Sequence, residues 1–373
     1  MGHKKLGFSP GGDRIVSGSN DQTVCVWDVK HGEMALGPLE KTLNDKVPTA
    51  YSPSGACIIS DSRDGLVLWD AETGNVVFGP FQLCRSIHSA SFSADGNFVI
   101  VGSTENTLQV MGVHTGEIIT EICPPLTDQS NRVHVTSAVF SPDGSRIAVG
   151  TMHYCLSMFD SQSGDLLYGP LGKCNNGSNS LAFSPDGTRI ASGSFSEVLV
   201  WDVQGGFRVL VLMLPKEHGP WVHSVGYSPD GNYIITGARD NTICVWNART
   251  GKPVIGPVKW HMAPVRSVRY SPDGARVVSG SDDRTIRVTD VRKDQFLSNS
   301  LTPTGCEWEL KTDGWVVDTK GRLLVWIPPD LRASLMWPRT QLLISRKGWL
   351  RLDFTGARLG ESWAKSDEPK SSD

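Results

Sequence analysis

The stretch Phe183-Ser184-Pro185-Asp186-Gly187 decides how this chain is interpreted, because it returns along the whole sequence. An aromatic residue followed by Ser, usually by Pro and then usually by Asp-Gly, recurs about every 43 residues. The copies begin at Phe8, Tyr51, Phe92, Phe140, Phe183, Tyr227 and Tyr270. A fixed period of this size is typical of a repeat architecture. Residues shared by all units are then expected to build the scaffold, and function is sought in what differs.

The sixth unit shows what one repeat encodes. Short apolar runs at 225–227, 233–236, 243–246 and 253–255 are separated by turn signals such as Asp230-Gly231. β-Branched and aromatic residues favour strands, and Asp-Gly favours a tight turn. No apolar pattern of helical period interrupts them. The unit therefore predicts four short antiparallel strands joined by hairpins.

A second recurring phrase, Gly-Pro, marks the fourth strand of four units. It occurs at 37–38, 79–80, 169–170 and 256–257. Proline has no N–H to donate to a sheet, so it belongs on an edge strand. The fourth strand is therefore predicted to be the outermost strand of each unit, and the first strand the innermost.

The end of the third strand carries the family resemblance. Trp27-Asp28, Trp69-Asp70 and Trp201-Asp202 close third strands, and Trp246-Asn247 nearly repeats them. This pattern resembles the WD40 repeat, which implies an all-β fold, a single β-propeller of four-stranded antiparallel blades around a central channel. Seven repeats are recognisable. With a degenerate eighth unit the ring has eight blades; the alternative is seven blades plus a tail.

WD40 blades also resemble one another in a buried, hydrogen-bonded set of His, Ser or Thr, Asp and Trp. The matching residues in units six, one, two and seven are His218, Thr236, Asp240 and Trp246; Ser17, Asp21 and Trp27; Ser60, Asp64 and Trp69; and His261, Ser279 and Asp283. His, Ser and Asp together are also the composition of a hydrolytic triad. Because the same types recur at the same offsets in several repeats, we interpret them as a structural network of paired buried polar groups.

The C-terminal part divides into a weak repeat and a tail. Lys311-Thr312-Asp313-Gly314 follows the seventh Asp-Gly turn at the repeat spacing, and strands are predicted over 308–310, 315–317, 323–326 and 341–344. Residues 1–301 are thus predicted to hold seven WD40 repeats. Residues 302–355 form a degenerate eighth repeat that closes or caps the propeller, because terminal repeats are often atypical. Residues 356–373 are predicted to be a disordered tail.

The N-terminal unit begins directly with its inner strand, Leu6-Gly7-Phe8. A ring must close to remove its edges, so either the tail closes it or the chain is the C-terminal part of something longer. The Gly-Pro phrase and the Trp-rich C-terminal unit resemble fungal WD40 proteins of the NACHT type. That resemblance implies an NTPase module upstream.

Composition narrows the class of partner and the compartment. The chain of 373 residues has a net charge of −3 and no long run of one sign, which argues against nucleic acid. No apolar run reaches transmembrane length, and no signal core follows the N-terminus, which argues against a membrane and favours a cytoplasmic location. The eight cysteines form no C-x-x-C pair and are interpreted as reduced core thiols.

The sequence contains none of the catalytic, nucleotide-binding or metal-binding motifs that we sought. A P-loop, a nucleophile elbow, H-E-x-x-H and EF-hand spacings do not occur, so no enzyme activity, cofactor or metal is predicted. The leading hypothesis is a non-catalytic scaffold for protein–protein interaction; the alternatives are a ligand-sensing propeller fragment of a larger NACHT-type NTPase and a propeller enzyme. Partner contacts are expected in the variable loops, although ordinary loop variation would look the same. The candidate residues are Pro125, Asp128, Arg132, Asn175, Lys216 and Trp221.

Overall fold

The computed structural model describes most of the chain up to residue 291 and five strands beyond it. The described ranges are 3–19, 22–39, 49–62, 65–81, 87–103, 107–124, 134–152, 154–173, 178, 180–214, 221–291, 308–310, 315–318, 323–326, 340–345 and 348–351. All regular elements in these ranges are strands. Within them, no helix is long and apolar enough to cross a membrane.

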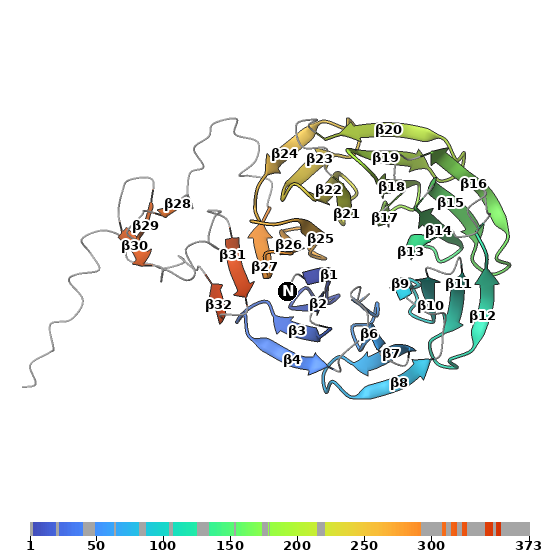
Figure 1. The fold of residues 1–373 in the computed structure, drawn as a ribbon, viewed down its shortest axis with the longest axis horizontal. Helices are drawn as coiled ribbons and strands as arrows, with labels where there is room; N and C mark the ends of the chain where they lie inside the picture. Colours follow the sequence, from blue (N-terminus) through green and yellow to red (C-terminus); the bar gives the residue numbers. More distant parts are fainter. Residues whose placement is uncertain are drawn as a thin grey trace, which may run out of the picture.

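Seven antiparallel blades surround a central channel, as Figure 1 shows; six of them have four strands, and the sheet of blade 7 has a fifth. Blade 1 contains β1 (His3–Phe8), β2 (Arg14–Ser19), β3 (Val24–Asp28) and β4 (Met34–Leu39). Blade 2 contains β5 (Thr49–Tyr51), β6 (Cys57–Ser62), β7 (Gly65–Asp70) and β8 (Val76–Phe81). Blade 3 contains β9 (Ile87–Phe92), β10 (Phe98–Ser103), β11 (Leu108–Gly112) and β12 (Ile118–Ile122). Blade 4 contains β13 (Val135–Phe140), β14 (Arg146–Thr151), β15 (Tyr154–Asp160) and β16 (Leu166–Lys173).

The remaining blades follow in the same order. Blade 5 contains β17 (Ser180–Phe183), β18 (Arg189–Gly193), β19 (Glu197–Asp202) and β20 (Arg208–Met213). Blade 6 contains β21 (Val222–Tyr227), β22 (Tyr233–Ala238), β23 (Ile243–Asn247) and β24 (Pro253–Val258). Blade 7 begins with β25 (Val265–Tyr270), β26 (Arg276–Ser281) and β27 (Thr285–Asp290). The recurring aromatic phrase ends the innermost strand of every blade, as the sequence predicts.

Blade 7 takes its fourth strand from far along the chain, which corrects the prediction of an eighth blade. β31 (Thr340–Ser345) pairs with β27, and β32 (Gly348–Arg351) pairs with β31. The strand predicted over 341–344 therefore completes blade 7, and the seven-blade alternative is the observed one. β28 (Trp308–Leu310), β29 (Trp315–Asp318) and β30 (Leu323–Trp326) form a separate three-stranded sheet, drawn outside the ring in Figure 1.

The hydrophobic core consists of seven clusters, each between two neighbouring blades. The cluster between blades 7 and 1 unites Leu6 and Ile15 with Val278, Ile286 and Leu342. β1 and β25 also pack side by side. The ring is therefore closed by blade 7 against blade 1, without an additional blade between them.

The recurring phrase forms a tight turn that satisfies its own polar groups. In blade 5 the Arg189 N–H donates to Ser184 Oγ at 2.9 Å, and Ser184 Oγ donates to Asp186 Oδ1 at 2.6 Å. The hydrogen bond from Ser184 lowers the pKa of Asp186. Gly187 has a φ of 70°, a left-handed conformation that favours glycine. The Asp-Gly signal is thus a structural requirement of the first hairpin.

The Asp of each Trp-Asp pair organises the next hairpin. Asp202 Oδ1 accepts from the Gly205 N–H at 2.7 Å, and Asp70 Oδ1 accepts from the Thr73 N–H at 2.7 Å. Asn247 Oδ1 does the same for the Thr250 N–H at 2.8 Å. An amide oxygen serves as well as a carboxylate at this position, which explains why Trp246-Asn247 tolerates the change.

Proline and glycine of the recurring phrase also join neighbouring blades. A Cβ built on Gly187 would lie 3.6 Å from Cδ of Pro142 in the preceding blade, and one on Gly12 would lie 3.3 Å from Cδ of Pro272. The equivalent contacts are Pro10 with Gly55, Pro53 with Gly96, Pro185 with Gly231 and Pro229 with Gly274. Gly144 has no such neighbour within 4 Å, because blade 3 carries Ala94 in place of proline.

Two further repeated positions join the blades by hydrogen bonds. The serine three residues before the aromatic accepts a backbone N–H from the next blade. These bonds are Ala138 N to Ser89, Leu181 N to Ser137, Val225 N to Ser180, Val268 N to Ser224 and Leu6 N to Ser267, at 3.0–3.2 Å. An arginine six residues after the aromatic donates to a carbonyl of the next blade. These bonds are Arg14 to Ala71, Arg146 to Val203, Arg189 to Ala248 and Arg276 to Gly12.

Candidate functional site

Blade 7 brings together the His, Ser and Asp that the sequence singled out. His261 Nδ1 lies 2.9 Å from Asp283 Oδ2, and His261 Nε2 lies 2.8 Å from Ser279 Oγ. Burial lowers the pKa of His261. Burial alone would raise the pKa of Asp283, but the hydrogen bond and charge of His261 outweigh it, so this pKa lies below its usual range. Ser279 is 0% exposed, so its hydroxyl is out of reach of a substrate.

The tryptophans of the same set donate to the predicted hydroxyl groups. Trp27 Nε1 donates to Ser17 Oγ at 2.8 Å, and Trp69 Nε1 donates to Ser60 Oγ at 2.8 Å. In blade 6, Trp246 Nε1 donates to Thr236 Oγ1 at 3.1 Å. These contacts hold the second and third strands of blades 1, 2 and 6 together.

Blade 5 contains one such pair that sequence reasoning missed. Trp201 Nε1 donates to Ser192 Oγ at 3.1 Å. The two residues have the same spacing as Ser60 and Trp69, so the repeat offset alone could have found them. Asp240 accepts from the Thr242 hydroxyl at 2.5 Å. The other predicted members, His218, Asp21 and Asp64, lie outside the described residues.

The two faces of the ring carry different segments of each repeat. One face carries the Asp-Gly turns, and we call it the Asp-Gly face. In an antiparallel blade, the segment that leads into the first strand and the hairpin between the second and third strands lie at the opposite end. We call this end the variable face, because the described strands that flank the insertions predicted as partner contacts end and begin there. Of those residues, Pro125, Asp128, Arg132, Asn175 and Lys216 lie outside the described residues, and Trp221 is described.

Trp221 forms an aromatic pair across the junction of blades 5 and 6. Its ring meets Phe195 edge to face, with centroids 6.1 Å apart and planes at 89°. The backbone holds this pair in place, since the Val222 N–H donates to Ser194 O at 3.0 Å and the Arg239 N–H donates to Trp221 O at 2.9 Å. Phe195 is nevertheless 37% exposed. A rigid, partly exposed aromatic pair therefore lies on the variable face.

Other apolar and cationic side chains lie on the same face over blades 4–7. Met152, Met213 and Met262 are each about half exposed. Towards the channel, Arg266 Nε donates to Asp282 Oδ2 at 2.7 Å, and Arg266 Nη1 lies 3.1 Å from His223 Nε2. This cluster links blade 6 to blade 7 beside the aromatic pair.

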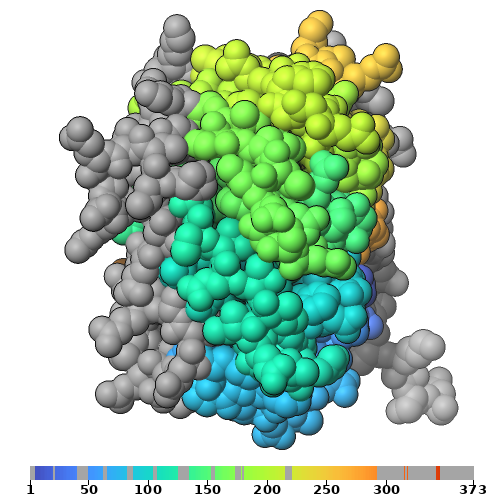
Figure 2. Space-filling model, turned by 90° about the vertical axis from the view of Figure 1, so that its right-hand side faces the viewer, coloured from blue at the N-terminus to red at the C-terminus, as the bar shows by residue number. Residues whose placement is uncertain are grey.

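On the rim of the ring, apolar residues are exposed at the same position in successive outer strands, unlike those on the variable face. Figure 2 views the rim from the side, with the outer strands of blades 2–5 facing the reader. Their exposed pairs are Val76 and Val77, Ile118 and Ile119, and Leu166 and Leu167. Because these pairs occupy the same position at the start of β8, β12 and β16, they belong to the repeat and distinguish no particular blade.

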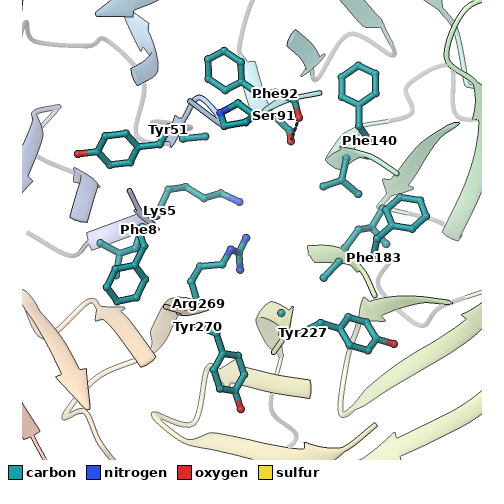
Figure 3. A pocket seen from close by; sticks show the side chains of 18 of the residues that line it. Lys5, Phe8, Tyr51, Ser91, Phe92, Phe140, Phe183, Tyr227, Arg269 and Tyr270 are labelled. Atoms are coloured by element: carbon teal, nitrogen blue, oxygen red, sulfur yellow. Dashed lines mark hydrogen bonds between the residues drawn. The ribbon is translucent and has the colours of Figure 1, made fainter. Parts of the chain in front are cut away.

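The central channel is lined by the innermost strands of all seven blades and has a volume of about 600 Å³. Figure 3 shows Lys5 of β1 and Arg269 of β25 extending into it, while the seven aromatic residues of the phrase point outward between the blades. Burial lowers the pKa of Arg269. Within the described ranges, no three His, Cys, Asp or Glu side chains gather in a way that could hold a metal ion.

Comparison with known proteins finds a family profile that matches four segments of this chain. The WD40 family profile, described as WD domain, G-beta repeat, matches residues 2–28, 170–202, 209–247 and 254–290. These ranges include the first three strands of blades 1, 5, 6 and 7. The profile gives no support to the NACHT-type resemblance, which stays a prediction.

Curated relatives share the repeats at low identity. The chain is 25% identical over 270 residues to Protein tipD of Dictyostelium discoideum, covering 69% of this chain and 41% of that protein. It is 28% identical over 259 residues to a guanine nucleotide-binding protein subunit beta of Arabidopsis thaliana, covering 64% and 67%. It is 26% identical over 153 residues to pre-mRNA-processing factor 19 of Bos taurus, covering 40% and 29%. The match thus spans less than half of two of these three relatives.

Proposed function

Because the chain is a β-propeller built of WD40 repeats, we propose that it is a non-catalytic scaffold that binds a protein partner on its variable face, around Phe195 and Trp221. The rigid ring positions the loops, and loops on a rigid frame commonly carry recognition. The relative named as a subunit of a guanine nucleotide-binding protein supports a role in assembly with other proteins.

The aromatic pair is the observation that carries this proposal. Trp and Arg are enriched among the residues that dominate binding energy at interfaces, and pre-positioned aromatic side chains contribute area at low entropic cost. Trp221 and Phe195 are held by backbone hydrogen bonds, and the Arg266 cluster lies on the same face. Met213 and Met262, which are about half exposed on the same face, add apolar side chains that adapt readily to a partner's shape.

The compartment belongs to the same proposal. We propose the cytoplasm, where thiols stay reduced. Cys57, Cys123 and Cys244 are free cysteines, which supports a reducing environment.

Affinity purification with crosslinking tests the docking face. The chain offers a matched control, because Phe78 on the rim is 39% exposed and Phe195 is 37% exposed. We expect F195A and W221A each to reduce capture of the partner at least about tenfold, since truncating a binding hot spot costs about 2 kcal/mol or more. F78A is expected to retain full capture. Equal capture by all three variants, or equal loss in F78A, would contradict the proposal.

A further inference from the structure

The channel wall carries an unusual cation at the junction of blades 6, 7 and 1. The position one before the recurring aromatic holds Gly7, Ala50, Ser91, Val139, Ala182 and Gly226 in six blades, and Arg269 in the seventh. Its ring neighbours on either side, Gly226 and Gly7, have no side chains. They leave room for a long side chain to reach into the channel, as Figure 3 shows.

Hydrogen bonds fix the Arg269 guanidinium through one nitrogen. Nη1 donates to Val268 O at 2.8 Å, to Ser224 Oγ at 3.0 Å and to Val225 O at 3.2 Å. These acceptors are neutral. Nε and Nη2 donate to no described residue, so the fork that recognises an oxyanion faces the channel in a fixed orientation. A bidentate Arg contact is the geometry that phosphate and carboxylate prefer.

Lys5 adds a second positive charge to the same channel. It occupies the position three before the aromatic, where five other blades carry the serine that joins them to their neighbours. Replacement by lysine gives up that serine contact at the junction of blades 1 and 2. No Asp or Glu is found among the described residues that line the channel. The carboxylates of the Asp-Gly turns instead accept hydrogen bonds within those turns, as Asp186 does from Ser184.

A channel lined by one sign of charge concentrates counter-ions of the opposite sign. The lining includes prolines of the Asp-Gly turns, such as Pro10, Pro229 and Pro272, so the cavity reaches the Asp-Gly face. Its volume of about 600 Å³ suits a small molecule. Serine side chains, including that of Ser91, add polar groups along the wall.

We propose that the channel binds a small phosphate-bearing molecule, held in the fork of Arg269 and neutralised further by Lys5. This site lies on the inner wall and is independent of the docking surface on the variable face.

Calorimetric titration of the full chain with inorganic pyrophosphate tests the site. We expect saturable binding with one site and a Kd at or below about 1 mM. R269Q is expected to weaken it at least tenfold, and K5Q severalfold. R269K keeps the charge but loses the fork, and is expected to fall between the native chain and R269Q. R208Q, on the exposed strand β20, removes the same charge far from the channel and should bind as the native chain does.

Circular dichroism and melting temperature establish that each variant is folded. If R269Q does not fold, R269K and K5Q carry the same test. No binding by the native chain, or an equal loss in R208Q, would overturn the proposal. Titration with citrate separates carboxylate from phosphate chemistry: citrate binding as tight as pyrophosphate would overturn the assignment to a phosphate-bearing ligand.

Discussion

The junction between blades 7 and 1 and the junction between blades 2 and 3 are held together very differently. At the first, Ser267 accepts the Leu6 N–H, Pro272 contacts Gly12 and Arg276 donates to Gly12 O. Of these three repeated contacts, the second junction keeps that of Pro53 with Gly96, because the equivalent serine and arginine positions hold Pro48 and Cys57.

This difference shows at which junctions between blades the repeated contacts are present. The first and last blades of the ring are not consecutive in sequence, so their junction depends on non-covalent contacts alone. It keeps all three contacts, as do the junctions of blades 4 with 5 and 5 with 6. Junctions 2–3 and 3–4 keep one contact each, and there the chain itself connects the blades. Ring closure therefore relies on the same repeated positions that join the other blades.

Removing two of the three closing contacts should have the largest effect. In S267A/R276A, the buried Leu6 N–H loses its acceptor and a carbonyl of Gly12 loses its donor. We expect a loss of about 2–4 kcal/mol in the free energy of unfolding, because an unsatisfied buried group costs about 1–3 kcal/mol and a typical hydrogen bond about 1. Urea unfolding measures this loss.

The matched control is S180A/R189A at the junction of blades 5 and 6. It should cost a similar free energy but leave β1 protected, whereas S267A/R276A should speed amide hydrogen exchange of β1. If β1 stays equally protected in both double variants, the closing junction has no special role.

A single serine at a poorly connected junction should have the next largest effect. S89A leaves the buried Ala138 N–H without its acceptor, and we expect a cost of about 1–3 kcal/mol. S180A, at a junction that keeps all three contacts, should cost the same within about 0.5 kcal/mol if the contacts act independently. A cost at Ser89 well below that at Ser180 would show that junction 3–4 is already loose, and would contradict independence.

Restoring a missing contact should have the smallest effect, and a stabilising one. A94P places proline at the second position of the turn, where the other blades tolerate it, and opposite the open space beside Gly144. We expect a gain of about 0.4–1 kcal/mol, because proline restricts the unfolded chain. P142A should lose a comparable amount at the junction of blades 4 and 5. Destabilisation by A94P in thermal unfolding would show that the turn of blade 3 differs from the others.

Much of the fold could be predicted from the sequence because every unit repeats the same local signals for strands and turns. The aromatic phrase marked the inner strands, and Gly-Pro marked the outer ones. The prediction of an eighth unit is wrong for the strand over 341–344, which is the fourth strand of blade 7. β31 follows β27 only after a long intervening segment, and its apolar run is compatible with the outer strand of any blade. The pair Ser192 and Trp201 was overlooked, although its offset is that of the other pairs.

The candidate site was less predictable. Trp221 was singled out for its place in a variable loop, but its partner Phe195 belongs to the preceding blade, and no sequence pattern links the two. No sequence pattern joins Lys5 with Arg269, because they lie far apart in the chain at positions where most blades have small residues.

The strands, the turns and the repeated contacts follow from the sequence alone, since they depend on local backbone preferences and on residues that recur at a constant offset. The number of blades, the source of the last outer strand and the placement of Lys5 and Arg269 in one channel emerge only in the folded ring. These features depend on closing a ring, which brings the first inner strand against the last. That closure is a property of how the units pack around a common axis, and no single repeat encodes it.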